Sequence, residues 1–327
     1  MTTPAVSVLI PVYNVEALLP RCLDSVLAQT FQDFEIVCVN DCSPDGSLEV
    51  LKQYAAKDSR VRIIDKPQNE GLMLARKTGY KSALGKYFFF LDSDDYIPAD
   101  TLEILYNEAE KKDADLTPGQ MTLVNTEGRE VFRPRASRAG RDRITYLKSI
   151  LHWNSPSLCG TLFNRRVFEG KNFSGRLHQS FSEDRILLTE ILLSGDLKIA
   201  PVEKNSYYYW MNTASITRRK ITRKDIDNQF EALFYCYDIV EKSGLGLTAD
   251  NKNFIARYLG LYIEKGADAE YIRNYNELSR ELLKFSELRR YTSFHFALHT
   301  VLCMRLPGYR PTLRALRLLI RKIQGKD

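Results

Sequence analysis

The sequence predicts an α/β protein, in which a mainly parallel sheet is covered by helices on both faces and is followed by a helical region. In the first third of the chain, short apolar runs alternate with segments of helical spacing, which is the order of strands joined by right-handed crossovers. From about Thr222 to the end the spacing is helical throughout. We therefore expect two domains, residues 1–221 with the sheet and residues 222–327 with the helices.

Four strands and three helices are expected in the first third. The strands are apolar runs bounded by turn residues, and each helix carries its apolar residues on one side. The turn Pro44-Asp45-Gly46-Ser47 supplies the start of the second helix. The expected strands are 6–10, 34–39, 61–64 and 87–91, and the expected helices are 16–29, 47–54 and 71–84.

The middle of the chain is less regular. Residues 121–125 and 131–132 flank a turn at Gly128 and predict a hairpin, and residues 157–163 are expected to return to the sheet. Further on we expect a helix over 181–193, short strands over 197–201 and 207–210, and helices over 225–242, 251–263, 271–285 and from 291.

Composition excludes several classes of protein. Apolar residues make up 44% and charged residues 27% of the chain, as in ordinary globular proteins. No apolar run approaches the ~18 residues of a membrane-spanning helix, and no signal peptide is visible at the N-terminus. We therefore expect the six cysteines to be reduced thiols in a cytoplasmic protein.

The net charge of +6 is concentrated at the C-terminal end. Residues 301–327 hold seven basic residues and one acid, whereas residues 1–300 hold 40 basic and 40 acidic residues. A nucleic-acid enzyme would spread basic charge over a groove in its body, so we expect no nucleic-acid partner.

Acidic residues gather where the expected strands end. Ligands of open parallel sheets bind beyond the carboxyl ends of the strands. The fourth strand is followed by Asp92, Ser93, Asp94 and Asp95. Packed carboxylates repel one another unless a cation joins them, and Mg²⁺ or Mn²⁺ takes such oxygen ligands. The competing interpretation is a surface turn that caps a helix starting near Pro98.

Phosphate-binding loops rich in glycine are absent from the sequence. No GxGxxG follows the first strand and no GxxxxGK[ST] occurs. A bound nucleotide would therefore be held without such a loop, with a metal on the acid cluster neutralising its phosphates.

Several segments occur in a fixed order along the chain. They are SVLIPVYN at 7–14, NDCSPDGS at 40–47, NEGLMLAR at 69–76, LDSDD at 91–95, SED at 182–184, YYY at 207–209 and SIT at 215–217. Together they resemble glycosyltransferase family 2, over roughly residues 5–220. The resemblance implies a GT-A fold, a nucleotide-sugar donor, a divalent metal (Mn²⁺ or Mg²⁺) and inversion at the anomeric carbon.

The resemblance also implies roles on the donor side of the site. Pro11 and Tyr13 match the loop that packs on the nucleotide base, and Asp41 matches the acid that accepts a hydrogen bond from uracil. Arg76 matches a basic residue beside the base or phosphates, which makes it a donor-binding candidate. A UDP-sugar is therefore the expected donor.

The same resemblance assigns the acids. Asp92-Ser93-Asp94 is the DxD motif, in which Asp94 matches the metal-binding acid and Asp92 the acid near the ribose or the metal. Asp184 matches the catalytic base of the pair Glu183-Asp184. The chain departs from the family at two positions: Asn40 stands where Asp is frequent, and Trp210 where related bacterial sequences often have Arg.

Sugar transfer needs two separate acid groups. A metal-bound carboxylate is a weak base, so the proton of the acceptor hydroxyl has to be taken by a second carboxylate. Glu183-Asp184, far along the chain, supplies this second group. A helix N-terminus also favours acids, and both interpretations can hold together.

We expect a hexosyltransferase that adds a sugar to a saccharide or lipid-linked acceptor in capsule, lipopolysaccharide or exopolysaccharide synthesis. A nucleotidyltransferase is the alternative among enzymes, although the first strand lacks the basic, glycine-rich loop it would need. A non-catalytic sugar-nucleotide-binding protein or membrane scaffold is the alternative outside enzymes, and retention of both acid groups argues against it.

The C-terminal tail has the pattern of an amphipathic helix. Its apolar side carries Leu313, Leu316, Leu319, Ile320 and Ile323, and its basic side carries Arg314, Arg317 and Arg321, with Leu318 intruding. Such a helix can lie on the anionic inner face of the plasma membrane. The competing interpretation is that the apolar side packs on preceding helices and the arginines are solvated.

Overall fold

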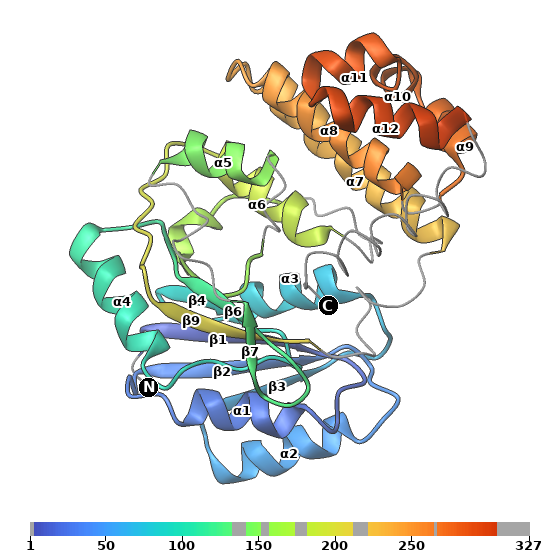
Figure 1. Cartoon of the computed structure of the whole chain (residues 1–327). Helices are drawn as coiled ribbons and strands as arrows, with labels where there is room; N and C mark the ends of the chain where they lie inside the picture. The colour runs from blue at the N-terminus through green and yellow to red at the C-terminus, as the bar shows by residue number, and fades with distance from the viewer. Residues whose placement is uncertain are drawn as a thin grey trace. The chain divides into compact units, whose positions relative to one another are not determined.

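The computed structural model describes residues 3–132, 142–151, 157–173, 182–211, 222–264 and 267–305. The chain divides into two compact units, one of residues 1–150 with 154–236 and one of residues 151–153 with 237–327. The first unit holds the sheets and the second is helical (Figure 1). The predicted division after residue 221 stays a prediction, and the helix that begins at Arg223 belongs to the first unit as far as Cys236.

A six-stranded sheet with the order β3-β2-β1-β4-β8-β5 forms the centre of the first unit (Figure 1). β1, β2, β3 and β4 are parallel, whereas β8 runs antiparallel to its neighbours β4 and β5. The strands are β1 (Val6–Val12), β2 (Phe34–Asn40), β3 (Val61–Asp65), β4 (Tyr87–Phe90), β5 (Leu116–Pro118) and β8 (Thr161–Asn164). The four predicted strands and the return of the chain after residue 157 are confirmed.

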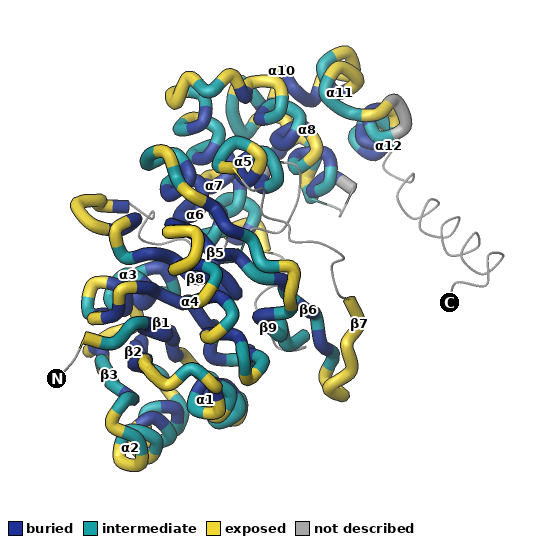
Figure 2. The backbone as a smooth tube through the Cα atoms, turned by 90° about the vertical axis from the view of Figure 1, so that its left-hand side faces the viewer, coloured by how far each residue is buried: buried dark blue, intermediate teal, exposed yellow. Residues whose placement is uncertain are grey.

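Helices cover both faces of this sheet. The chain proceeds from β1 outward to β3 through α1 (Leu19–Leu27) and α2 (Ser47–Lys57), then crosses back through α3 (Leu72–Ser82) to β4 on the other side of β1. Right-handed crossovers therefore place α1 and α2 on one face and α3 on the other, as Figure 1 shows. Figure 2 shows β1 and β2 between them as buried, and β4 is buried as well. The order of strands reverses between β1 and β4, which is where ligands bind in sheets of this topology.

A second sheet has the order β7-β6-β9 and stands over the end of β4. The predicted hairpin is confirmed as β6 (Gln120–Val124) and β7 (Glu130–Phe132), with Gly128 at φ 78° in its turn. β9 (Asn205–Trp210) pairs with β6 in parallel and forms an isolated bridge between Tyr208 and Tyr96. This pairing carries β9 to the acid cluster after β4.

The remaining helices are α4 (Thr101–Lys112), α5 (Arg143–Leu151), η1 (Arg165–Val167), α6 (Glu183–Leu193), α7 (Arg223–Lys242), α8 (Thr248–Glu264), α9 (Ala269–Asn274), α10 (Glu277–Leu282), α11 (Phe285–Tyr291) and α12 (Phe294–Arg305). Neither β5 nor α5 was predicted from the sequence patterns. No helix in the described ranges is long and apolar enough to cross a membrane. The six cysteines all lie within the described residues and are free thiols.

Two predicted elements are wrong. The expected strand over 197–201 makes only an isolated bridge, between Ile199 and Leu116. The single helix expected over 271–285 is broken, because the Asn276 side chain accepts a hydrogen bond from Ser279 N (2.7 Å) and caps a new helix, α10. The tail from residue 306 and the SIT segment at 215–217 lie outside the described residues.

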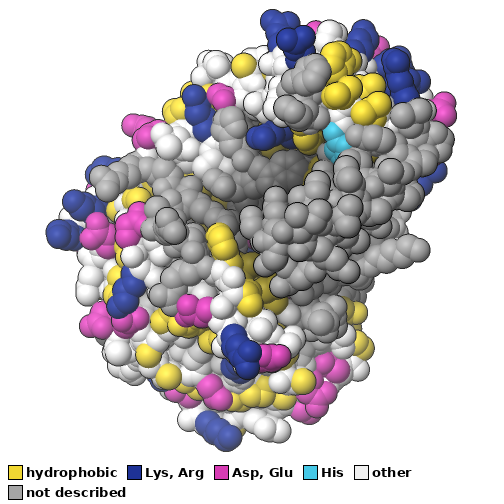
Figure 3. Space-filling model, in the orientation of Figure 1, with side chains coloured by type: hydrophobic (Ala, Val, Ile, Leu, Met, Phe, Trp, Pro, Cys, Tyr) yellow, Lys and Arg dark blue, Asp and Glu magenta, His cyan; other side chains and the backbone are white. Residues whose placement is uncertain are grey.

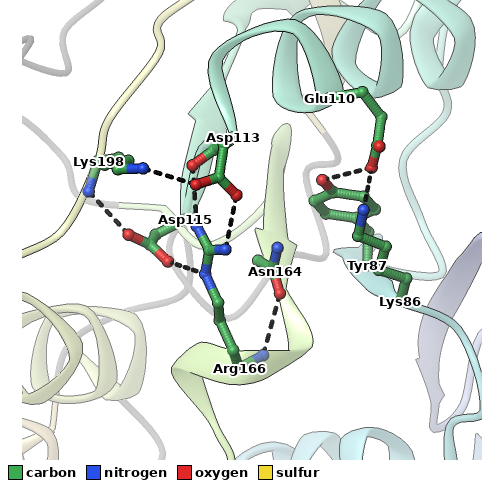
Figure 4. A network of polar contacts seen from close by, with 8 residues as sticks. All are labelled: Lys86, Tyr87, Glu110, Asp113, Asp115, Asn164, Arg166 and Lys198. Atoms are coloured by element: carbon green, nitrogen blue, oxygen red, sulfur yellow. Dashed lines mark hydrogen bonds and ion pairs between the residues drawn. The ribbon is translucent and has the colours of Figure 1, made fainter.

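Charged side chains are mixed on the surface. On the face drawn in Figure 3, acidic and basic side chains lie beside one another over the described part of the first unit. One group of these charges fixes the edge strand β5, and Figure 4 shows it at close range. Arg166 donates to Asp115 (2.6 Å) and Asp113 (2.7 Å), and Lys198 pairs with Asp113 (2.6 Å). Three chain segments are thus joined at the end of α4.

Candidate active site

The first two strands end in loops that hold each other. Asn14 after β1 (φ 54°) and Cys42 after β2 (φ 57°) both adopt the left-handed conformation, which non-glycine residues rarely take outside turns and functional sites. Asn14 N donates to Ser43 Oγ (3.3 Å). Pro11 is buried inside β1, whereas Tyr13 is 48% exposed, so only Tyr13 offers its side chain to a ligand in solution.

Asp41 lies buried at the end of β2. It pairs with Lys66 (2.6 Å) and accepts hydrogen bonds from Glu70 N (3.1 Å) and Gly71 N (2.7 Å). Gly71 has φ 92°, a conformation that favours glycine, and it precedes α3 directly. Asp41 therefore fixes the loop that begins α3. The predicted contact with uracil stays a prediction, and Lys66 is a site residue that the sequence patterns did not single out.

The acid cluster after β4 is anchored through Asp95. Its buried carboxylate accepts hydrogen bonds from Tyr207 Oη (2.7 Å) and Trp210 N (2.7 Å), both on β9. Burial, together with the charges of Asp94 and Asp92, raises the pKa of Asp95 well above its usual range. Helix α4 begins only at Thr101, after Asp100, so the cluster does not cap that helix.

Helix α1 supports the same loop from the other side. Arg21 Nη2 donates to the backbone oxygen of Asp94 (2.6 Å). Its guanidinium lies over the rings of Tyr96 (4.7 Å) and Trp210 (3.9 Å). Arg21 is a second residue that sequence reasoning missed, because nothing in the spacing of α1 distinguishes it from a solvated basic residue.

Asp94, the second acid of the motif, is half-buried. Within the described part of the chain no side chain donates a hydrogen bond to its carboxylate. Burial, aided by the charge of Asp92, raises the pKa of Asp94 to about 6. A carboxylate in this setting has free oxygens and excess negative charge, which are the properties of a cation ligand.

Arg76 on α3 joins the DxD motif to the Glu183-Asp184 pair. Its Nη2 donates to Asp92 Oδ1 (2.8 Å), and its Nη1 donates to Asp184 Oδ1 and to Glu183 Oε1 (3.4 Å). Although burial opposes the charged form, the carboxylates of Asp184 and Asp92 raise the pKa of Arg76 above its usual range. Four predicted site residues thus form one cluster.

The acid pair lies in the first turn of α6. Ser182 before it adopts the left-handed conformation (φ 63°), and its side chain caps no backbone N–H. Burial raises the pKa of Glu183 to about 7, with a contribution from the charge of Asp184, and burial also raises the pKa of Asp184. The second oxygen of Asp184 accepts a long hydrogen bond from Leu158 N (3.4 Å).

No group of three or more acidic, cysteine or histidine side chains in the described ranges could hold a metal ion. The residues that fit a cation are Asp94, whose carboxylate receives no side-chain hydrogen bond, and Asp92, of which Arg76 occupies one oxygen. Protein ligands alone would leave such a cation open to phosphate oxygens and water, as is usual for Mg²⁺. Ser93 between the two acids is buried.

Comparison with known proteins places this arrangement in context. The family model described as "Glycosyl transferase family 2" matches residues 7–170. "Glycosyltransferase GlyA" of Streptococcus pneumoniae is 33% identical over 65% of this chain and 31% of its own length. "Uncharacterized glycosyltransferase EpsJ" of Bacillus subtilis is 30% identical over 72% of this chain and 70% of its own length. The chain thus spans about a third of the first relative and more than two thirds of the second.

A third relative, "Poly(ribitol-phosphate) beta-glucosyltransferase" of Bacillus spizizenii, is 33% identical over 62% of this chain and 32% of its own length. Among solved structures, residues 1–349 of S. aureus TarS in complex with UDP-GlcNAc superpose with a TM-score of 0.69 at 19% identity, over 95% of this chain and 92% of that one. The GT-A fold is therefore confirmed. The family match and the 30% identity to a relative covered over 70% of its length establish that this chain belongs to glycosyl transferase family 2.

Proposed function

We propose that the chain transfers a sugar from a UDP-sugar to a hydroxyl of a saccharide or lipid-linked acceptor, with inversion at the anomeric carbon. The observation that carries the proposal is the cluster in which Arg76 joins Asp92 of the DxD motif to Asp184 of α6. Two carboxylate groups, one for the donor and one for the acceptor, are what a direct displacement needs. The TarS structures in complex with UDP and with UDP-GlcNAc support the donor class.

The donor side is assigned to the ends of β1, β2 and β4. Tyr13 is exposed beside the end of β1 and is proposed to lie against the base. Asp41 is proposed to accept a hydrogen bond from uracil, in addition to the three donors it already has. Asp94 and Asp92 would hold Mn²⁺ or Mg²⁺, which when bound neutralises the charge that develops on the departing diphosphate.

The acceptor side is assigned to Asp184. Its Oδ1 is held by Arg76, so Oδ2, with only a long hydrogen bond from Leu158 N, is the oxygen available to an acceptor hydroxyl. Asp184 takes the hydroxyl proton while the acceptor oxygen attacks the anomeric carbon, from the side opposite to the departing nucleotide. A single displacement of this kind inverts the anomeric carbon. Glu183 beside it, with a pKa raised to about 7, limits the negative charge of the pair near neutral pH.

We also propose that the tail of residues 306–326 binds the inner face of the plasma membrane and that the acceptor is a precursor of a surface polysaccharide. Support comes from the position of the excess charge, since residues 301–327 carry seven of the 47 basic residues and one acid. A relative named for poly(ribitol-phosphate) glucosylation supports an acceptor class of cell-surface polymers.

A donor screen tests the proposal. The full chain is incubated with a panel of nucleotide sugars and Mn²⁺ or Mg²⁺, and release of the nucleoside diphosphate is measured. We expect turnover with one or more UDP-sugars, loss of turnover in excess EDTA, and none with Asp94→Ala, because the diphosphate then lacks its cation. Asp196→Ala, which removes an exposed acid after α6, is the matched control. Full activity of Asp94→Ala would contradict the proposal.

A further inference from the structure

Arg76 is a charged residue of the site that is almost completely buried. Its side chain is 1% exposed, on the buried side of α3 where that helix packs on β1 and β2. Removing a guanidinium from water costs several kcal/mol unless well-placed partners compensate. A buried arginine at this position therefore calls for a reason beyond filling space.

All hydrogen bonds that the structure gives Arg76 go to carboxylates. Nη2 binds one oxygen of Asp92, and Nη1 binds one oxygen each of Asp184 and Glu183. Nε is buried and has no partner among the described residues. The two ends of a single rigid guanidinium thus hold Asp92, in the loop after β4, and Asp184, on α6, which lie 16 and 108 positions away in the sequence.

Arg76 binds only one carboxylate oxygen of Asp92 and only one of Asp184. Asp92 Oδ1 and Asp184 Oδ1 are taken by Arg76, and within the described residues the other oxygen of Asp184 receives only the long hydrogen bond from Leu158 N. Asp92 is 29% and Asp184 18% exposed, so each keeps an accessible part although Arg76 does not. The accessible parts are those that could meet ligands.

We infer that Arg76 is a positioning residue. It fixes the distance between the carboxylate of Asp92, on the donor side, and the carboxylate of Asp184, the proposed base. This inference rests on the proposed function and deepens it. A planar guanidinium can bind two carboxylates in fixed directions, whereas the ammonium group of lysine is a point charge that fixes no direction. Since a misplacement of about 1 Å at a reacting centre can cost ~10²-fold in rate, such fixing matters for transfer.

The competing interpretation is the one the sequence predicts, in which Arg76 contacts the base or phosphates of the donor. The two interpretations differ in what a conservative change does. A donor contact contributes to nucleotide affinity, whereas a residue that positions Asp92 and Asp184 contributes to the rate of transfer from the bound state.

The experiment compares Arg76→Lys with the full wild-type chain. The measurements are the thermal unfolding midpoint, the Kd of UDP with Mn²⁺ by calorimetry, and kcat and KM for transfer with the donor found in the screen. We expect a folded protein, a Kd and donor KM within ~3-fold of wild type, and a kcat at least ~100-fold lower. Arg62→Lys is the matched control, since Arg62 also binds two partners, Glu35 and Ser82 O, at the start of β3.

Two results would overturn the inference: an unchanged kcat, or a loss of UDP affinity as large as the loss of kcat. If Arg76→Lys does not fold, Arg76→Gln with Glu183→Gln removes one buried charge of each sign, and we expect it to fold and bind UDP without transfer. Failure of both variants to fold would assign Arg76 to folding and overturn the inference too.

If the wild-type chain turns over none of the donors in the screen, this result counts against the proposed function alone. The crystal structure of Arg76→Lys then decides the inference. We expect the distance between the Asp92 and Asp184 carboxylates to differ from that in the wild type. Unchanged positions of both carboxylates would overturn the inference.

Discussion

Asp92, Asp94 and Asp95 are neighbours in sequence and have three different environments. Asp92 is paired with Arg76, Asp95 accepts hydrogen bonds from Tyr207 and the backbone of Trp210, and Asp94 receives no side-chain hydrogen bond in the described ranges. Asp92 and Asp95 are therefore held in place by contacts within the protein. Among these three acids, Asp94 is the one whose carboxylate the described side chains leave unbound, so its loss should matter most for metal binding.

At the same scale, Asp184→Asn should separate binding from chemistry. The amide keeps the shape of the side chain but cannot accept the proton of the acceptor, so we expect transfer to fall by ~10²–10⁴-fold. The affinity for UDP and Mn²⁺, measured by calorimetry, should stay near wild type. A variant that loses UDP binding in step with transfer would assign Asp184 to the donor site.

Glu183 gives the site a pH dependence of stability. Burial, with the charge of Asp184, raises its pKa from 4.5 to about 7. The folded state then binds more protons than the unfolded state between these values, so the free energy of unfolding falls as the pH rises from 4.5 to about 7.

Glu183→Gln tests this dependence. We expect the thermal unfolding midpoint of the variant to fall less than that of wild type as the pH rises from about 5 to 7. Glu169→Gln, which replaces an exposed glutamate outside the cluster, is the control and should keep the wild-type slope. Identical slopes for wild type and Glu183→Gln would mean that Glu183 titrates normally in the folded chain.

Among the secondary-structure elements, the edge strand β5 follows a group of ion pairs. It has only three residues, and the charges of Figure 4 join its start to η1 and to the segment at residue 198. Asp113 at the end of α4 has φ 47°, so the left-handed turn and the ion pairs occur at the same residue. Asp113 therefore links the end of a helix to the edge of the sheet.

Hydrogen bonds from Lys198 and Arg166 lower the pKa of Asp113 from 3.8 to about 2. A lowered folded-state pKa adds stability above pH 3.8 that is lost as the pH falls through about 2. Asp113→Asn should therefore weaken the pH dependence of the free energy of unfolding in the acid range. Asparagine is the suitable replacement because it tolerates the left-handed backbone conformation. Chemical unfolding between about pH 2 and 5 measures this, with Asp196→Asn as the exposed-acid control. If the free energy of unfolding changes with pH in parallel for wild type and Asp113→Asn, these ion pairs do not contribute to acid stability.

At the scale of the whole molecule, the charge of the chain is uneven. The first 300 residues are neutral in sum, and acidic and basic side chains alternate on the surface drawn in Figure 3. The excess of +6 belongs to residues 301–327. A membrane surface with anionic lipids would attract that end in particular, at up to ~1 kcal/mol for each basic residue.

Sedimentation with liposomes tests this attraction. The full chain should bind vesicles that contain anionic lipid, bind neutral vesicles less, and release at high salt. A full-length variant with Arg314, Arg317 and Arg321 changed to Gln should bind less, as should a chain ending before Pro307. Equal binding by all three proteins, or no binding by the full chain in low salt, would leave the tail as a packing element.

Local patterns were enough for much of the fold. Apolar runs and turn residues predicted β1 to β4, α1 to α3 and the β6-β7 hairpin, because their signals lie within a few neighbouring residues. The break at Asn276 was missed because the helical spacing continues on both sides of it, where the Asn276 side chain caps α10 through Ser279 N. β5 was missed because its three residues form a strand only through their pairing with β8.

The sequence by itself determined the alternation of strands and helices in the first third and the family, and it predicted both acid groups, since motifs and periodicity are local properties. Tertiary structure decided what those groups touch. Arg76, predicted beside the donor, is buried between Asp92 and Asp184, and Arg21 supports the Asp94 loop without any signal in the sequence. Such contacts join residues 16 to 108 positions apart, and their energies depend on burial and geometry that only the folded chain creates.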